Sequence, residues 1–181
     1  MIKEESTYKM PKNCLTFPTT IVLAVSIFLG CGNSSSRSST CDSDVTDNLE
    51  GHITDGLKVK LSTNKDTYLS GENPELSLTV TNVSDQPINV TFFNSQESDF
   101  IVCRDGMEIW RRSHDSSFLQ LITTVTIQPD ANYLFTGFSD GIAREIFERK
   151  DNSGKIIAPG DYTVYGQFNK YDSNKKIIRL E

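Results

Sequence analysis

Ser113, His114 and Asp115 are the three residue types of a hydrolase triad: a nucleophile, a general base and the group that orients the base. A triad needs the hydroxyl, the imidazole and the carboxylate within hydrogen-bond reach of one another. Consecutive side chains on an extended chain point to opposite faces, so these three cannot meet. We therefore interpret residues 113–115 as a solvated loop. The sequence offers no other positive sign of an enzyme.

Metal and cofactor sites find equally little support in the sequence. A zinc site needs three or four convergent ligands, and the chain has only two histidines, His52 and His114, without a cysteine pair near either. The acidic residues between positions 42 and 50 lack the glycine and the spacing of a calcium loop. We expect no metal ion and no cofactor.

The cysteines raise a question that the sequence leaves open. If the protein is exported, Cys41 and Cys103 would meet an oxidising compartment and could pair. Cys41, however, lies in a polar stretch, and nothing in the sequence fixes its distance from Cys103. We favour the alternative that Cys103 is an ordinary half-buried strand residue.

The N-terminal segment has the pattern of an export signal. Lys9 and Lys12 precede a nine-residue apolar run at 21–29, well short of the ~20 residues that span a bilayer as a helix. Gly30 and Cys31 follow, and this ending resembles a bacterial lipoprotein signal peptide over residues 1–30. The resemblance implies that acyl chains on Cys31 hold the protein to a membrane of the cell envelope, facing outside the cytoplasm. An uncleaved anchor and an ordinary signal with a coincidental cysteine are the alternatives.

Composition divides the rest of the chain into two parts. Residues 31–55 are rich in serine and other small polar residues, and predict a flexible tether with too little apolar surface to fold. Residues 56–181 are expected to form one folded domain. The net charge of the 181-residue chain is −6 and no basic face is evident, so we expect no nucleic-acid partner.

Short alternating segments predict the elements of this domain. Leu57, Val59 and Leu61 alternate with polar residues, and the pattern recurs at 75–81 and 162–168. Further apolar runs lie at 88–93, 118–127, 132–138 and 175–180, with turn-forming residues between them. No stretch has a convincing helical period. The pattern predicts an all-β fold, an immunoglobulin-like antiparallel sandwich of about eight to nine strands.

The clearest local signal is a hairpin around Asp105-Gly106, since Asp-Gly between two strand-like runs favours a two-residue type I′ turn. In that register Ile101 pairs with Trp110, so Trp110 lies on the face opposite Val102. Because both faces of this hairpin carry apolar residues, we expect it in the interior of a sheet.

Three segments around this hairpin resemble the BsuPI family of intracellular proteinase inhibitors: LTVTNVSDQPINVTFFNSQESDFIVC, GMEIWRRSHDSSF and SGKIIAPGDYTV. The resemblance covers roughly residues 68–168. The resemblance implies a sandwich fold, and it leads us to expect inhibition of serine proteases. The matched positions that we assign to the scaffold are Asn82, Asp99, Phe100, Gly106, Trp110, Phe118, Gly154, Pro159, Gly160 and Tyr162.

Two functions therefore compete. The first is an envelope-anchored inhibitor of subtilisin-type serine proteases that presents a rigid loop. Candidate loops are residues 111–117, with Arg111 and Arg112 as tentative contact residues, and residues 139–160. We expect Trp110 and Phe118 to be core residues. The second is a non-inhibitory module that binds or helps to assemble another envelope protein.

Overall fold

The structure is a computed structural model that describes residue 41 and residues 50–181, with the exception of the side chain of Asp115. The predicted signal peptide and residues 31–40 and 42–49 of the predicted tether, including Cys31, lie outside the described residues. Within the described part of the chain, no helix has the length and apolar character needed to cross a membrane.

The domain consists of strands and a single turn of 3₁₀ helix, η1 (Arg112–Asp115). The strands are β1 (His52–Thr54), β2 (Leu57–Thr63), β3 (Thr67–Tyr68), β4 (Glu75–Asn82), β5 (Ile88–Phe92), β6 (Ser98–Arg104), β7 (Met107–Arg111), β8 (Thr123–Ile127), β9 (Ala143–Ile146), β10 (Gly160–Phe168), β11 (Tyr171–Asp172) and β12 (Lys176–Leu180). The number exceeds the expected eight to nine because β1, β3 and β11 are very short.

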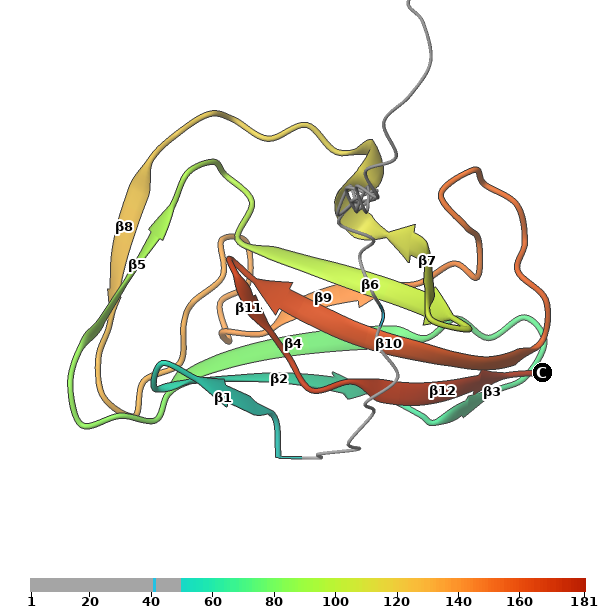
Figure 1. The fold of residues 1–181 in the computed structure, drawn as a ribbon, viewed down its shortest axis with the longest axis horizontal. Helices are drawn as coiled ribbons and strands as arrows, with labels where there is room; N and C mark the ends of the chain where they lie inside the picture. Colours follow the sequence, from blue (N-terminus) through green and yellow to red (C-terminus); the bar gives the residue numbers. More distant parts are fainter. Residues whose placement is uncertain (1–40, 42–49) are drawn as a thin grey trace, which may run out of the picture. The chain divides into compact units, whose positions relative to one another are not determined.

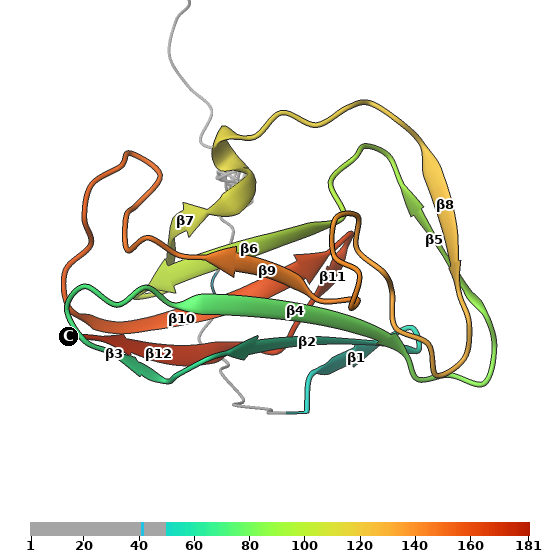
Figure 2. The ribbon, with the colours of Figure 1, turned by 180° about the vertical axis from the view of Figure 1, so that it is seen from behind.

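Two sheets form the layers of a sandwich (Figures 1 and 2). One has the strand order β1-β2-β4-β9, and the other has the order β3-β12-β10-β6-β7, with β11 beside β10. The strands pair antiparallel, apart from the two-residue parallel pair of β12 with β3. Strands β5 and β8 make a separate two-stranded ribbon at one end of the sandwich (Figure 1). The all-β, immunoglobulin-like sandwich predicted from the sequence is confirmed.

Strict alternation explains the core between the layers. In β2 the residues Leu57, Val59 and Leu61 are buried, and in β4 every second residue is buried from Leu76 to Asn82. Phe100 of β6 packs into the same core. These inward positions are the ones that the two-residue period predicted.

Strand β6 is buried on both faces, and a cystine explains its second face. Cys41 is bonded to Cys103, with 6.1 Å between the Cα atoms. Together with Ile101 and Tyr165, the two cysteines form a small apolar cluster separate from the main core. Our preference for an unpaired Cys103 was therefore wrong. The position of Cys41 could not be predicted, because the polar sequence around it has no hydrophobic periodicity.

The hairpin has the expected turn but a different register. Asp105 and Gly106 both have positive φ, and Arg104 pairs with Met107 as predicted. A β-bulge then shifts the ladder, so that Val102 pairs with Trp110. Our pairing of Trp110 with Ile101 was wrong because a simple two-residue alternation does not foresee an inserted residue. We also expected both strands of the hairpin in the interior of the sheet. Among the described strands, β7 lies at the edge of this sheet and only β6 is interior.

The folded part also begins earlier than expected. Residues 52–54, which we placed in the tether, form β1 and pair with the start of β2. Residues 132–138, which we expected as a strand, form only an isolated bridge between Asn132 and Thr81. In the apolar run 118–127 only Thr123–Ile127 becomes a strand. The preceding residues therefore form a long connection between η1 and β8.

Candidate functional site

Most residues selected from the family resemblance hold the scaffold together. Asn82 is fully buried; its amide donates to the carbonyl oxygens of Gln86 and Ile127, each at 2.8 Å. Its Oδ1 accepts hydrogen bonds from the backbone and hydroxyl of Ser84. One side chain therefore shapes the turn after β4 and ties that strand to β8. Phe100 lies wholly in the main core, and Gly154 takes a positive φ in the turn 151–154.

Pro159, Gly160 and Tyr162 form the corner that leads into β10. The buried Tyr162 donates its hydroxyl hydrogen to the carbonyl of Ala158, as in the tyrosine corner of immunoglobulin-like sandwiches. Arg104 donates to the same hydroxyl at 3.0 Å. Gly160 has a φ of +147°, and an added Cβ would lie 3.2 Å from a guanidinium nitrogen of Arg104. The corner therefore joins β10 to the hairpin end of β6.

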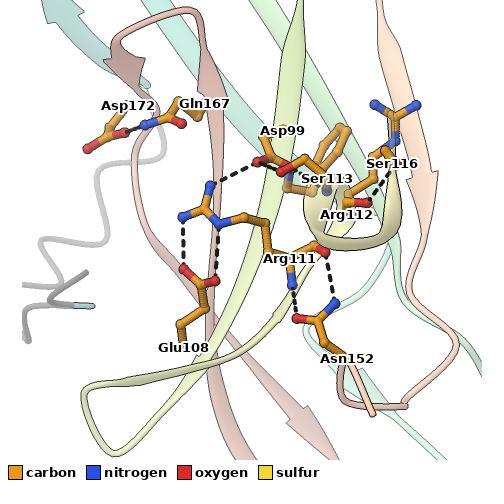
Figure 3. Close-up of polar contacts among 10 residues, drawn as sticks. Asp99, Glu108, Arg111, Arg112, Ser113, Ser116, Asn152, Gln167 and Asp172 are labelled. Atoms are coloured by element: carbon orange, nitrogen blue, oxygen red, sulfur yellow. Dashed lines mark hydrogen bonds and ion pairs between the residues drawn. The ribbon is translucent and has the colours of Figure 1, made fainter. Parts of the chain in front are cut away.

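The bulge in the hairpin creates a polar network on the outer face of the sheet (Figure 3). It places Arg111, rather than Trp110, opposite Ile101. The Arg111 guanidinium then bonds Asp99 at 2.8 Å and both carboxylate oxygens of Glu108, at 3.0 and 2.8 Å. Trp110 moves to the inner face and packs on Phe147, with 5.0 Å between the ring centroids. Trp110 is only partly buried there.

Asp99 is the centre of this network. Only 2% of its side chain is exposed, and it accepts hydrogen bonds from the backbone N–H and the hydroxyl of Ser113, at 3.0 and 2.6 Å. These bonds fix η1 on the end of β6. Hydrogen bonds to Glu108 and, to a smaller extent, to Asp99 raise the pKa of Arg111 above its ordinary value, although partial burial opposes this shift. Arg111 is therefore a permanently charged structural link.

Two further contacts fix the neighbouring segments. Asn152 accepts from the backbone N–H of Arg111 at 2.9 Å and donates to its carbonyl oxygen at 3.0 Å (Figure 3). The amide thus pairs like an added strand residue and holds the loop 147–159 against β7. Arg112 is more exposed and forms an ion pair with Glu145 of β9 at 2.8 Å. Neither arginine projects freely from a loop, as the tentative contact role would suggest.

The hydrolase-like trio is also arranged differently from the sequence expectation. Residues 113–115 lie in η1 rather than on an extended strand. In a 3₁₀ helix successive residues are rotated by about 120° around the axis, so the side chains of Ser113 and His114 leave η1 in different directions. Ser113 donates its hydroxyl hydrogen to Asp99. Within residues 41 and 50–181 no group of three histidine, cysteine, aspartate or glutamate side chains could hold a metal ion.

The most exposed apolar part of this region is the connection between η1 and β8, residues 116–122, which we call the linking segment. Figure 1 shows it as the arc between these two elements. Leu119, Leu121 and Ile122 expose between 58% and 74% of their surface. Sequence reasoning missed these residues because the run 118–127 looked like a strand. The available signal was the absence of any charge between Asp115 and Asp130.

A cleft of about 560 Å³ lies beside the linking segment. Phe118 and Leu121 line it from this segment, facing an aromatic group at one end of the core. That group comprises Phe92, Tyr133, Phe135 and Phe138. Phe118 is half-buried at the cleft rather than in the core, contrary to expectation. Desolvation, with a smaller contribution from Glu97, raises the pKa of Tyr133, so its phenol stays neutral.

Comparison with known families decides what this scaffold is. The family model described as "BsuPI: Intracellular proteinase inhibitor" matches residues 61–172, a range that runs from β2 to β11. The chain belongs to the BsuPI family. The match includes the tyrosine corner, the Asp99 network and the linking segment. The resemblance seen in the sequence is thereby confirmed.

Other comparisons are distant. A search among curated proteins found no match. Among solved structures, the BsuPI chain is similar to a β-glucosidase from Erythrobacter marinus (13% identity, TM-score 0.39, 69% of this chain and 15% of that one). It is also similar to the alkylpurine DNA glycosylase AlkC of Pseudomonas fluorescens (14% identity, TM-score 0.41, 70% of this chain and 30% of that one). A third similar structure is the CARDB domain of PF1109 from Pyrococcus furiosus (10% identity, TM-score 0.38, 69% of this chain and 87% of that one). The chain spans less than a third of the first two proteins, and these likenesses carry no functional inference.

Proposed function

We propose that this BsuPI domain inhibits a serine protease of the subtilisin type while acyl chains on Cys31 hold it at the bacterial cell envelope. The observation that carries the inhibitory part is the family match over residues 61–172. The structure adds physical support, because protein inhibitors of proteases bind with little backbone movement and need a rigid scaffold. In this domain the buried Asp99 and Asn82 fix the elements around the exposed linking segment.

The inhibitory function is tested by titrating the full-length protein, extracted in detergent, against subtilisin and several unrelated serine proteases. We expect subtilisin activity to fall in proportion to the inhibitor added, at micromolar concentration or below. Gel electrophoresis of the mixture must show that the inhibitor stays intact, because a competing substrate would be degraded. Unchanged activity of every protease at micromolar excess would contradict the proposal.

Anchoring at the envelope is tested separately, in the bacterium that makes the protein. Cys31→Ala is expected to abolish incorporation of labelled fatty acid and to move the protein from the membrane fraction to the soluble fraction. The thiol of Cys31 is the proposed acyl acceptor, and alanine cannot replace it. Cys14→Ala is the matched control and should leave both results unchanged. Equal labelling of wild type and Cys31→Ala would exclude this anchor.

The second candidate, a non-inhibitory envelope module, is favoured by the cleft beside the linking segment, which has an aromatic wall. Such clefts suit protein partners of many kinds. Crosslinking in intact cells distinguishes the two functions. A protease among the crosslinked proteins supports inhibition, whereas a reproducible non-protease partner, together with failed titration, supports the module.

A further inference from the structure

The linking segment, residues 116–122, exposes three large apolar side chains that lie close together in the sequence. Leu119 is 74% exposed, Leu121 58% and Ile122 71%, all within four residues. Leu134, on the same cleft, is 67% exposed. Several large apolar side chains exposed close together in a folded domain commonly mark a site for a partner.

The segment is held in one conformation despite its lack of regular structure. The backbone N–H of Leu119 donates to the hydroxyl of Ser95, and the backbone N–H of Ser95 donates to the carbonyl of Leu119, both at 2.9 Å. The N–H of Leu121 donates to the same carbonyl at 3.0 Å, which closes a tight turn. A pre-formed segment loses little conformational entropy when it binds.

Both ends of the segment are fixed as well. At the first end, the bonds between Ser113 and Asp99 hold η1 on strand β6. At the second end, Thr123 pairs with Phe92 and begins the ribbon β5–β8. Between these ends Phe118 turns into the cleft, so the segment has an anchored inner side and an exposed outer side.

The charge pattern separates this segment from the other loop that could meet a protease. No charged residue lies between Asp115 and Asp130, although the chain carries a net charge of −6. The loop 147–159 instead carries Glu148, Lys150 and Asp151, and its carboxylates are engaged within the loop. Uncharged apolar side chains suit apolar substrate subsites. The charged side chains of the loop 147–159 would lose their hydration in such subsites, which costs free energy.

We propose that the linking segment is the part of this inhibitor that enters the protease, with Leu119 and Ile122 occupying apolar side-chain subsites of the substrate cleft. The partner surface is thus an apolar, peptide-binding cleft of a serine endopeptidase. This inference rests on the proposed inhibitory function and adds the contact residues to it. The loop 147–159 then serves as support for β7.

Single aspartate substitutions test this assignment, with subtilisin as the probe. Ile122→Asp and Leu119→Asp in the full-length protein should each raise the inhibition constant at least tenfold, because a carboxylate would have to enter an apolar subsite. Ile156→Asp is the matched control: Ile156 is 73% exposed and lies in the loop 147–159. It should inhibit like the wild type. Thermal unfolding of each variant checks that the fold is unchanged.

The outcomes separate the two levels of the proposal. If the wild type inhibits no protease, the inhibitory function fails and this assignment fails with it. If the wild type inhibits and Ile122→Asp and Leu119→Asp inhibit equally well, inhibition stands but the linking segment is not the contact. A loss confined to Ile156→Asp would transfer the contact to the loop 147–159.

Discussion

Removal of the cystine, by replacing both Cys41 and Cys103 with alanine, is expected to lower the free energy of unfolding by about 4 kcal/mol. The two residues are 62 positions apart, and closing a loop of that length removes much of the conformational entropy of the unfolded chain. Alanine keeps these buried positions apolar, so the change acts mainly on the cross-link. The measurement is chemical denaturation followed by the fluorescence of Trp110.

Reductant provides the control for this prediction. Wild-type protein unfolded in the presence of a dithiol should lose stability to the level of the double alanine variant, and the variant itself should not respond. Equal stability of the oxidised wild type and the variant would show that the cystine does not constrain the unfolded chain. The cost also has a local part, because Cys41 covers Ile101 and Tyr165 on the outer face of the sheet.

The second large effect is expected at Arg111. Arg111→Met keeps the aliphatic stem of the side chain but removes the cation beside Asp99, whose side chain is only 2% exposed. Removing one partner of a buried ion pair costs about 3–5 kcal/mol, because the remaining charge is left uncompensated. We expect about 3 kcal/mol here, since Ser113 still donates two hydrogen bonds to the carboxylate. Denaturant unfolding measures the change.

The adjacent arginine is a matched control. Arg112→Met removes a more exposed pair with Glu145 and should cost less than about 1 kcal/mol. Adding Asp99→Asn to Arg111→Met should recover part of the loss, because the buried charge then disappears together with its partner. If Arg111→Met and Arg112→Met were equally stable, the buried ion pair of Arg111 with Asp99 would contribute no more to stability than the exposed pair of Arg112 with Glu145.

The sequence predicted those parts of the fold that depend on local periodicity. Strands β2 and β4 followed from strict alternation, since one face of each lies in the core. The turn at Asp105-Gly106 followed from the backbone preference of the two residues. The sequence identified Pro159, Gly160 and Tyr162 as positions matched to the family, but it did not predict the tyrosine corner that they form.

The remaining features depend on contacts between distant segments. The bulge in β7 is one inserted residue without a sequence signature, yet it exchanges the faces of Trp110 and Arg111. The cystine joins residues that no local pattern relates. The linking segment looked like a strand because its residues favour strands, but Ser95 and η1 hold it outside any sheet. The candidate site could therefore not be predicted from local sequence, because contacts between distant segments determine its structure.

The cystine between Cys41 and Cys103 also makes the first part of the domain a covalent ring, which changes what a proteolytic cut does to the molecule. One cut between these residues, for example in the turn after β4, would leave the two new ends joined in a single molecule. The linking segment lies outside this ring. A cut there would leave two chains that only noncovalent contacts hold together, chiefly the ladders of β6 with β10 and of β5 with β8. Electrophoresis without reductant would thus distinguish a nick in the ring from a nick at the proposed contact.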